Sequence, residues 1–161
     1  MSDFHVYAQN YEPYRGEGFY VSPYVGYSFG EGNGINSGAF VGYKFSNGFC
    51  LEANGAYRKL KSDMVSQALI YSAFDISVEK RTFLNAAIGA GVTFCPDKEI
   101  IPIMGVKFSI GVNVWKSVIG IYICYNSETL FIRRNFDNTN FVHGLTLGMR
   151  FLFDVEELKK E

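Results

Sequence analysis

Six charged side chains lie within segments where bulky apolar residues occupy every second position. They are Lys44, Glu52, Arg58, Asp75, Lys107 and Arg150. Because successive residues of a strand point to opposite faces, each charge shares a face with small and polar residues. Charges on an enclosed face need partners. We therefore predict a structural ion-pair network in which Glu52 pairs with one or more of the four basic residues, and a gated ion path is the alternative.

The residue types that most often build catalytic or metal sites are scattered along the chain. Cys50, Cys95 and Cys124 form no CxxC motif, and their odd number favours free thiols over a disulfide framework. His5 stands alone and cannot make a metal site by itself. No GxGxxG sequence follows a predicted strand and opens a helix, so nucleotide binding has no support. The sequence predicts no catalytic residue, no metal and no cofactor.

The composition favours one all-β domain. The chain has 161 residues, of which 48% are hydrophobic, 17% aromatic and 19% charged. The charged share lies below the roughly 25% of ordinary globular proteins. No uninterrupted apolar run approaches the ~20 residues that a membrane-spanning helix needs. A net charge of −1 gives no electrostatic case for binding nucleic acid.

Alternation of apolar and polar residues indicates eight strands. The clearest case is residues 19–29, where Phe19 and Val21 share one face and Tyr20 and Ser22 share the other. The predicted strands cover residues 18–30, 37–45, 49–58, 68–78, 82–94, 101–114, 118–126 and 141–153. Their lengths suit a tilted membrane crossing of about 9–11 residues. An even number of strands lets an antiparallel barrel close without a free edge.

The bulky apolar face of these strands is expected to point outward. A face of Gly, Ser, Tyr, Asn and charges packs poorly as a dry core, but it suits the lumen of a barrel whose outer surface meets lipid. We therefore predict a closed antiparallel up-and-down transmembrane β-barrel. A soluble ligand-binding barrel, the rival fold, would need the bulky face inside. Outward aromatic residues near strand ends are typical of interfacial girdles. They are Tyr27, Tyr43, Tyr57, Tyr125, Phe141 and Phe153.

The connections between the predicted strands alternate in length. Short turns at residues 46–48, 79–81 and 115–117 alternate with longer segments at 31–36, 59–67, 95–100 and 127–140. Outer-membrane barrels have short periplasmic turns and longer extracellular loops, so both termini are expected in the periplasm. The longest segment carries Arg133, Arg134 and Phe136. Arginine and aromatic side chains anchor binding surfaces, which makes these three residues the candidate recognition loop.

Three stretches of the sequence carry a family resemblance. They are residues 18–21 (GFYV), 42–52 (GYKFSNGFCLE) and 148–153 (GMRFLF). Together they resemble the small eight-stranded outer-membrane β-barrels of Gram-negative bacteria, the OmpX, Ail, NspA, Opa and OmpA membrane-domain type. The resemblance spans about residues 18–153 and implies a lumen plugged by ion pairs. It also implies that Phe153 serves as the terminal aromatic signal for the barrel-assembly machinery, although eight residues follow it here.

The expected organisation has three parts: an N-terminal periplasmic segment (1–17), a transmembrane barrel (18–153) and a charged C-terminal tail (154–161). The expected location is the bacterial outer membrane, and the expected role is structural or surface recognition and adhesion through extracellular loops. The expected partners are outer-membrane lipid and lipopolysaccharide, the assembly machinery and host surface molecules. Because the N-terminus shows no basic segment followed by an apolar one, we expect Met1 to precede a processed mature chain.

A lipid-modifying enzyme of the outer leaflet is the alternative function. One family of lipid-A-deacylating barrels uses an outward histidine with a nearby serine and glutamate. His143 is expected on the outward face near the extracellular end, but its neighbours are Gly144, Leu145 and Thr146. This set does not match the motif, so we expect an interfacial histidine and no enzymatic activity.

Overall fold

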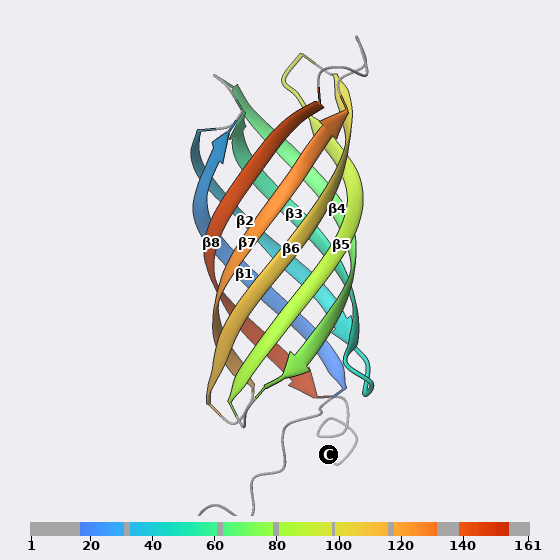
Figure 1. Ribbon diagram of the computed structural model, residues 1–161, viewed down its shortest axis with the longest axis vertical. Coiled ribbons are helices and arrows are strands. Elements are labelled where there is room, and N and C mark those ends of the chain that lie inside the picture. The colour runs from blue at the N-terminus through green and yellow to red at the C-terminus, as the bar shows by residue number, and fades with distance from the viewer. Residues whose placement is uncertain are drawn as a thin grey trace, which may run out of the picture.

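Eight antiparallel strands form a closed barrel in which each strand pairs with its neighbours in chain order (Figure 1). The computed structural model describes residues 17–30, 33–60, 63–78, 81–97, 99–115, 118–131 and 139–154. The strands are β1 (Gly18–Gly30), β2 (Gly34–Lys44), β3 (Phe49–Leu60), β4 (Asp63–Ser77), β5 (Thr82–Phe94), β6 (Ile100–Trp115), β7 (Ile119–Phe131) and β8 (Thr139–Asp154). The predicted all-β closed barrel of eight strands is confirmed. In the described part of the chain, no helix is long and apolar enough to cross a membrane.

Pairing between the first and last strands closes the sheet. β1 pairs with β8 from Gly18 opposite Asp154 to Gly30 opposite Val142. β1 begins and β8 ends at the lower end of the barrel in Figure 1. Closure gives the backbone N–H and C=O groups of every strand two neighbouring strands, so the sheet has no free edge.

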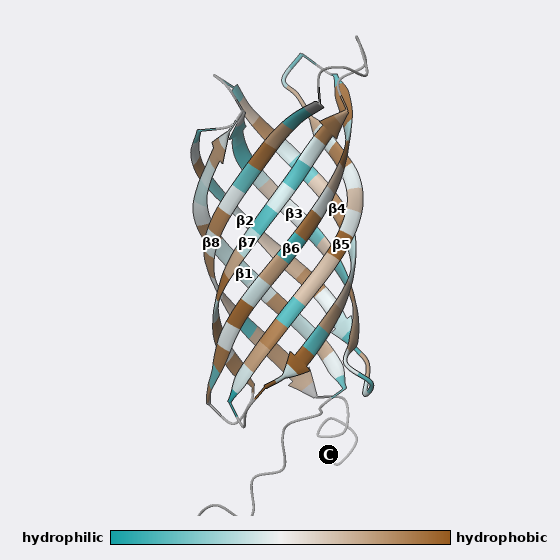
Figure 2. Ribbon diagram, viewed as in Figure 1, coloured by the Kyte–Doolittle hydropathy of each residue, from teal (hydrophilic) through white to brown (hydrophobic). Residues whose placement is uncertain are grey.

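The strands present two different faces along their whole length. Figure 2 shows hydrophobic and hydrophilic residues alternating along the ribbons. Outward Ile88 and Phe108 are 59% and 56% exposed, whereas inward Tyr20 and Glu52 are each 1% exposed. The alternation predicted for residues 19–29 is confirmed, with the bulky apolar set outside.

Several strands extend further than the sequence indicated. The prediction of a polar connection over residues 59–67 is wrong, because β3 continues to Leu60 and β4 begins at Asp63. The predicted loop over residues 127–140 is also shorter than expected, since β7 continues to Phe131 and β8 begins at Thr139. Strand pairing uses backbone groups, so polar side chains at a strand end do not stop the ladder while a neighbouring strand continues.

Inward aromatic rings lie against inward glycines on the adjacent strand. The directly paired residues are Tyr20 and Gly42, Tyr24 and Gly38, Tyr71 and Gly89, Phe83 and Gly111, and Tyr122 and Gly148. A Cβ atom built on each of these glycines would lie within 2.8 Å of an atom of the opposing ring. The absence of a side chain on the glycines therefore leaves room for large rings inside a narrow barrel.

We expect Gly89→Ala to destabilise the barrel by roughly 1–3 kcal/mol through overpacking. Its new Cβ atom would meet Ile70 O and Tyr71 Cδ1, each at 2.5 Å. Gly55→Ala is the matched control, because a Cβ atom at outward-facing Gly55 has no atom within 4 Å. Urea titration in lipid vesicles gives the free energy of unfolding of both variants. Equal stability of the two would contradict this packing argument.

Candidate functional site

The candidate site is the charged interior of the barrel. The six charged residues selected from the sequence all point inward, and none is more than 9% exposed. They come from five strands: Lys44 from β2, Glu52 and Arg58 from β3, Asp75 from β4, Lys107 from β6 and Arg150 from β8. A seventh inward charge, Glu128 of β7, joins them. Together they form three separate ion-pair groups.

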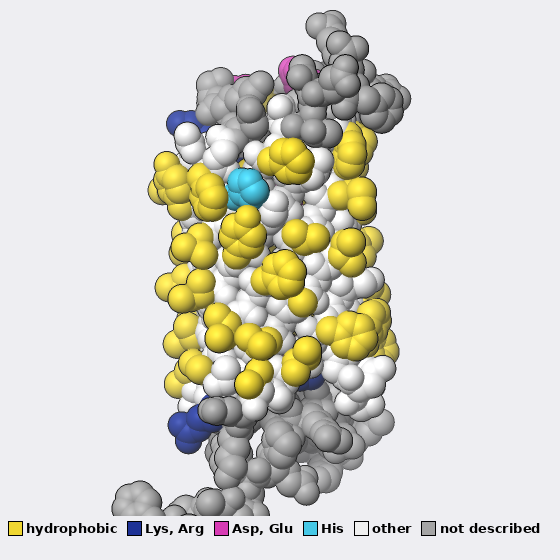
Figure 3. All heavy atoms as spheres, viewed as in Figure 1, with side chains coloured by type: hydrophobic (Ala, Val, Ile, Leu, Met, Phe, Trp, Pro, Cys, Tyr) yellow, Lys and Arg dark blue, Asp and Glu magenta, His cyan; other side chains and the backbone are white. Residues whose placement is uncertain are grey.

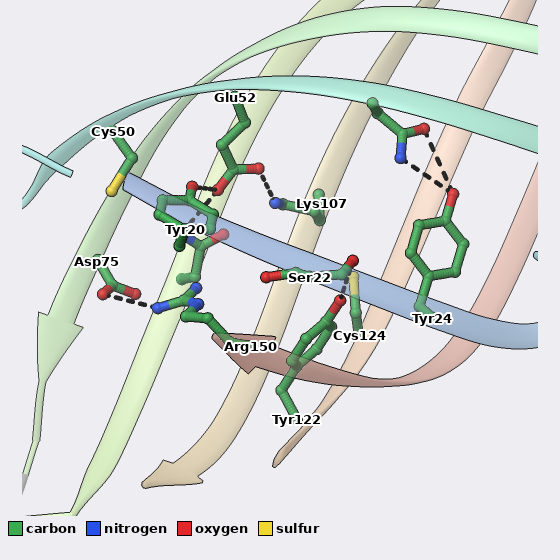
Figure 4. A network of polar contacts seen from close by, with 12 residues as sticks. Tyr20, Ser22, Tyr24, Cys50, Glu52, Asp75, Lys107, Tyr122, Cys124 and Arg150 are labelled. Atoms are coloured by element: carbon green, nitrogen blue, oxygen red, sulfur yellow. Dashed lines mark hydrogen bonds and ion pairs between the residues drawn. The ribbon is translucent and has the colours of Figure 1, made fainter. Parts of the chain in front are cut away.

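The central group is built on Glu52 (Figure 4). Lys107 forms an ion pair with Glu52 Oε2, and the Tyr20 hydroxyl donates a hydrogen bond to Glu52 Oε1 at 2.6 Å. The Lys107 ammonium also lies 4.0 Å from the centre of the Phe40 ring. Charge-assisted hydrogen bonds and a cation–π contact thus hold a buried acid and a buried base together.

The second group lies toward the end of the barrel that carries the connections after β1, β3, β5 and β7, here called the loop end. It pairs Arg58 with Glu128. Arg58 donates two hydrogen bonds to the two carboxylate oxygens, at 2.8 and 3.1 Å. The amides of Gln67 and Asn126 donate to the same carboxylate, at 3.2 and 2.8 Å. Sequence reasoning missed Glu128 by assigning it to a loop. The alternation of inward residues in β7 continues through Asn126 to Glu128, and this signal could have found it.

The third group lies at the opposite end of the barrel, which carries the short connections after β2, β4 and β6 and is here called the short-turn end. This group has two bases and one acid. Lys44 Nζ and Arg150 Nη1 both contact Asp75 Oδ2, at 2.8 and 3.0 Å. Lys44 therefore pairs across β3 with β4 and not with Glu52. The Arg150 guanidinium also lies over the rings of Tyr20 and Phe83, 5.0 and 4.3 Å from their centres.

Aliphatic side chains occupy the interior at the opposite, loop end. Five inward residues lie within three positions of the strand ends and are at most 5% exposed. They are Val65, Ile101, Ile103, Leu130 and Val142. The sequence pattern predicts small and polar residues on this face, so these aliphatic residues differ from the expectation. Their apolar side chains lower the polarity of the lumen beside the Arg58–Glu128 pair.

An aromatic cluster surrounds His143 on the outer wall. The Phe29 ring stacks on the imidazole with centroids 5.5 Å apart, and Tyr125 Oη lies 2.8 Å from His143 Nδ1. Figure 3 shows a histidine side chain, in cyan, among apolar side chains in the upper part of the visible wall. The described residues place no serine or carboxylate in a hydrogen bond with this ring. Ser127 of β7 is paired directly with His143 of β8, but the hydrogen bond that the structure describes for the imidazole is made with Tyr125.

In the described part of the chain, the cysteines form neither a disulfide nor a metal site. Cys50, Cys95 and Cys124 are free, and the described residues contain no cluster of three potential metal ligands. Burial, together with the carboxylates of Asp97 and Glu99, raises the pKa of the Cys95 thiol. A raised pKa opposes formation of the nucleophilic thiolate. The recognition-loop residues Arg133, Arg134 and Phe136 lie outside the described residues.

Comparison with solved structures places the fold among membrane β-barrels. The crystal structure of Neisserial surface protein A (NspA) is similar with a TM-score of 0.65 at 11% identity, over 84% of this chain and 97% of that chain. A de novo designed transmembrane β-barrel is similar with a TM-score of 0.57 at 15% identity, over 86% of this chain and 96% of the design. Searches of protein-family models and of curated proteins gave no match.

We expect Glu128→Leu to cost about 3–5 kcal/mol, because it leaves Arg58 buried without its acid. The double variant Arg58→Leu/Glu128→Leu should recover a substantial part of that loss. Glu99→Gln, at an exposed connection, is the control and should leave stability unchanged. Urea unfolding of the wild type, Arg58→Leu, Glu128→Leu and the double variant in lipid vesicles gives the coupling energy, and additive single-variant costs would contradict a direct pair.

Proposed function

We propose that this protein is a bacterial outer-membrane β-barrel whose lumen is closed by its own side chains and whose role is structural. The single observation that carries the proposal is the inversion of the usual faces. Large apolar side chains cover the outside, and paired charges fill the inside. This distribution is stable where the solvent outside the wall is hydrocarbon.

The outer wall supports contact with lipid. Figure 3 shows apolar side chains over the visible wall and Lys and Arg side chains only near its two ends. At the short-turn end, neighbouring outward rings contact one another from Phe19 through Tyr43 to Phe45, with centroids 4.8 and 4.9 Å apart. The Phe29, Tyr125 and His143 cluster occupies the opposite half. Aromatic residues at both ends of an apolar band are typical of membrane interfaces.

The interior supports a closed lumen. An eight-stranded barrel is only wide enough for side chains to fill its interior. Here the three ion-pair groups, the rings packed on glycines and the aliphatic residues at the loop end occupy that space. A cavity at the short-turn end has a volume of 20 Å³, close to the space of one water molecule. These features favour a barrier over a continuous aqueous path.

The other candidate functions receive less support. A soluble ligand-binding barrel needs a polar exterior and an apolar cavity, and the distribution of the described residues is the reverse. A lipid-modifying enzyme needs an acid and a nucleophile that act with His143. Ser127 is its cross-strand neighbour, but the described hydrogen bond of the ring is with Tyr125 and no described carboxylate contacts it. Surface recognition and adhesion remain predictions that depend on Arg133, Arg134 and Phe136. Lipopolysaccharide, the assembly machinery and host molecules remain predicted partners.

We expect Ile88→Arg to reduce the stability of the membrane-inserted barrel by roughly 2–4 kcal/mol, because Ile88 lies at the middle of β5 and faces outward. Ile35→Arg is the matched control, since Ile35 is also outward but is the second residue of β2. Its cost should be about 0–1 kcal/mol, as near a membrane interface. A urea titration of folding into lipid vesicles gives the stability of both variants. Equal, small effects of the two substitutions would contradict a lipid-facing wall.

We expect the wild-type barrel to show no large, steady conductance in planar bilayers, because the described side chains fill the lumen. Circular dichroism and resistance to protease in the same lipid preparation should verify that the barrel is folded and inserted. A stable open channel formed by folded protein would contradict the closed-lumen proposal. It would leave the membrane-barrel proposal intact and favour the ion path instead.

A further inference from the structure

The charges that the structure describes inside the barrel do not balance. Of the seven buried charged side chains that the structure describes in the lumen, four are basic and three are acidic. The Arg58–Glu128 and Lys107–Glu52 pairs are each neutral. The group at the short-turn end has two bases, Lys44 and Arg150, for Asp75 alone. One excess positive charge therefore belongs to this group.

The single negative charge of Asp75 balances the positive charge of only one of its two basic partners. Lys44 and Arg150 both reach the same oxygen, Asp75 Oδ2. Arg150 Nε and Asp75 Oδ1 are buried and have no hydrogen-bond partner among the described residues. The rings of Tyr20 and Phe83 lie against the Arg150 guanidinium and limit its access to water. A buried cation without a counter-charge is costly in such surroundings.

The 20 Å³ cavity adjoins this group. Its lining includes Lys44, Asp75 and Arg150, together with the polar side chain of Asn113. It lies at the short-turn end, where Ser77 ends β4 and Val118 precedes β7. Two basic groups, the carboxylate of Asp75 and an amide therefore face a space of about the size of one water molecule. That space is large enough for one water molecule or one halide ion.

We propose that this cavity binds a small inorganic anion of halide size, which is chloride under physiological conditions. The anion receives hydrogen bonds from Lys44 and Arg150 and balances the excess positive charge beside Asp75. A water molecule is the competing occupant, because it could also bridge the unpartnered buried atoms. The proposal is independent of whether the barrel has a structural or a recognition role.

Bromide provides a direct test with the full-length protein in detergent. Crystals grown in sodium bromide should show an anomalous difference peak in the cavity beside Lys44 and Arg150. In thermal unfolding at constant sodium concentration, replacing gluconate by chloride should raise the midpoint by a few degrees, with saturation. Absence of the peak together with equal midpoints in chloride and gluconate would overturn the proposal in favour of water.

Three variants separate the cavity from general salt effects. Lys44→Met leaves the neutral Asp75–Arg150 pair, and Asn113→Asp adds a carboxylate to the cavity lining, so both should lose the chloride dependence. Arg81→Gln removes an exposed base near the same end and should keep it. If Lys44→Met fails to fold, Asn113→Asp and the bromide crystals still decide the question. Loss of chloride dependence in Arg81→Gln alone would place the anion at the surface and overturn the proposal.

Discussion

The pairing of β1 with β8 is the constraint on which the other features of the barrel depend. It joins the two ends of one continuous sheet, so backbone groups are satisfied within the wall. Once no edge needs water or another chain, the outward side chains are free to be apolar. The same closure fixes a narrow interior, and every inward side chain must fit within it.

That narrow interior explains two patterns that look unrelated along the sequence. Large rings such as Tyr71 lie opposite glycines such as Gly89, because two large residues cannot share one level of the lumen. Buried charges occur in groups because each needs a partner within hydrogen-bond distance, as Arg58 and Glu128 show. Volume and charge are thus matched across the lumen between strands that are far apart in the chain.

The sequence predicted the strands and their faces well, because alternation is a local property of a strand. It also placed Glu52 and Lys107 on the inward face, but it could not identify which charges meet. Arg58 and Glu128 are 70 positions apart in the chain, and their contact depends on the stagger of β3 relative to β7. The positions at which several strands begin and end were also predicted incorrectly. The ladder at Asp63 and Glu128 continues through pairing with a neighbouring strand, which local polarity does not reveal.

The two ends of the lumen differ in a way that bears on its role. Aliphatic residues such as Leu130 and Val142 occupy the loop end, while Lys44, Asp75 and Arg150 border a small cavity at the short-turn end. Water and small ions therefore have a polar site to enter from one end and an apolar barrier at the other. An anion held beside Arg150 would balance charge without providing a path to the loop end, because the next charged group, Glu52 with Lys107, is already neutral. Charge compensation and closure of the lumen are compatible for this reason, and the anion is best understood as part of the packed interior.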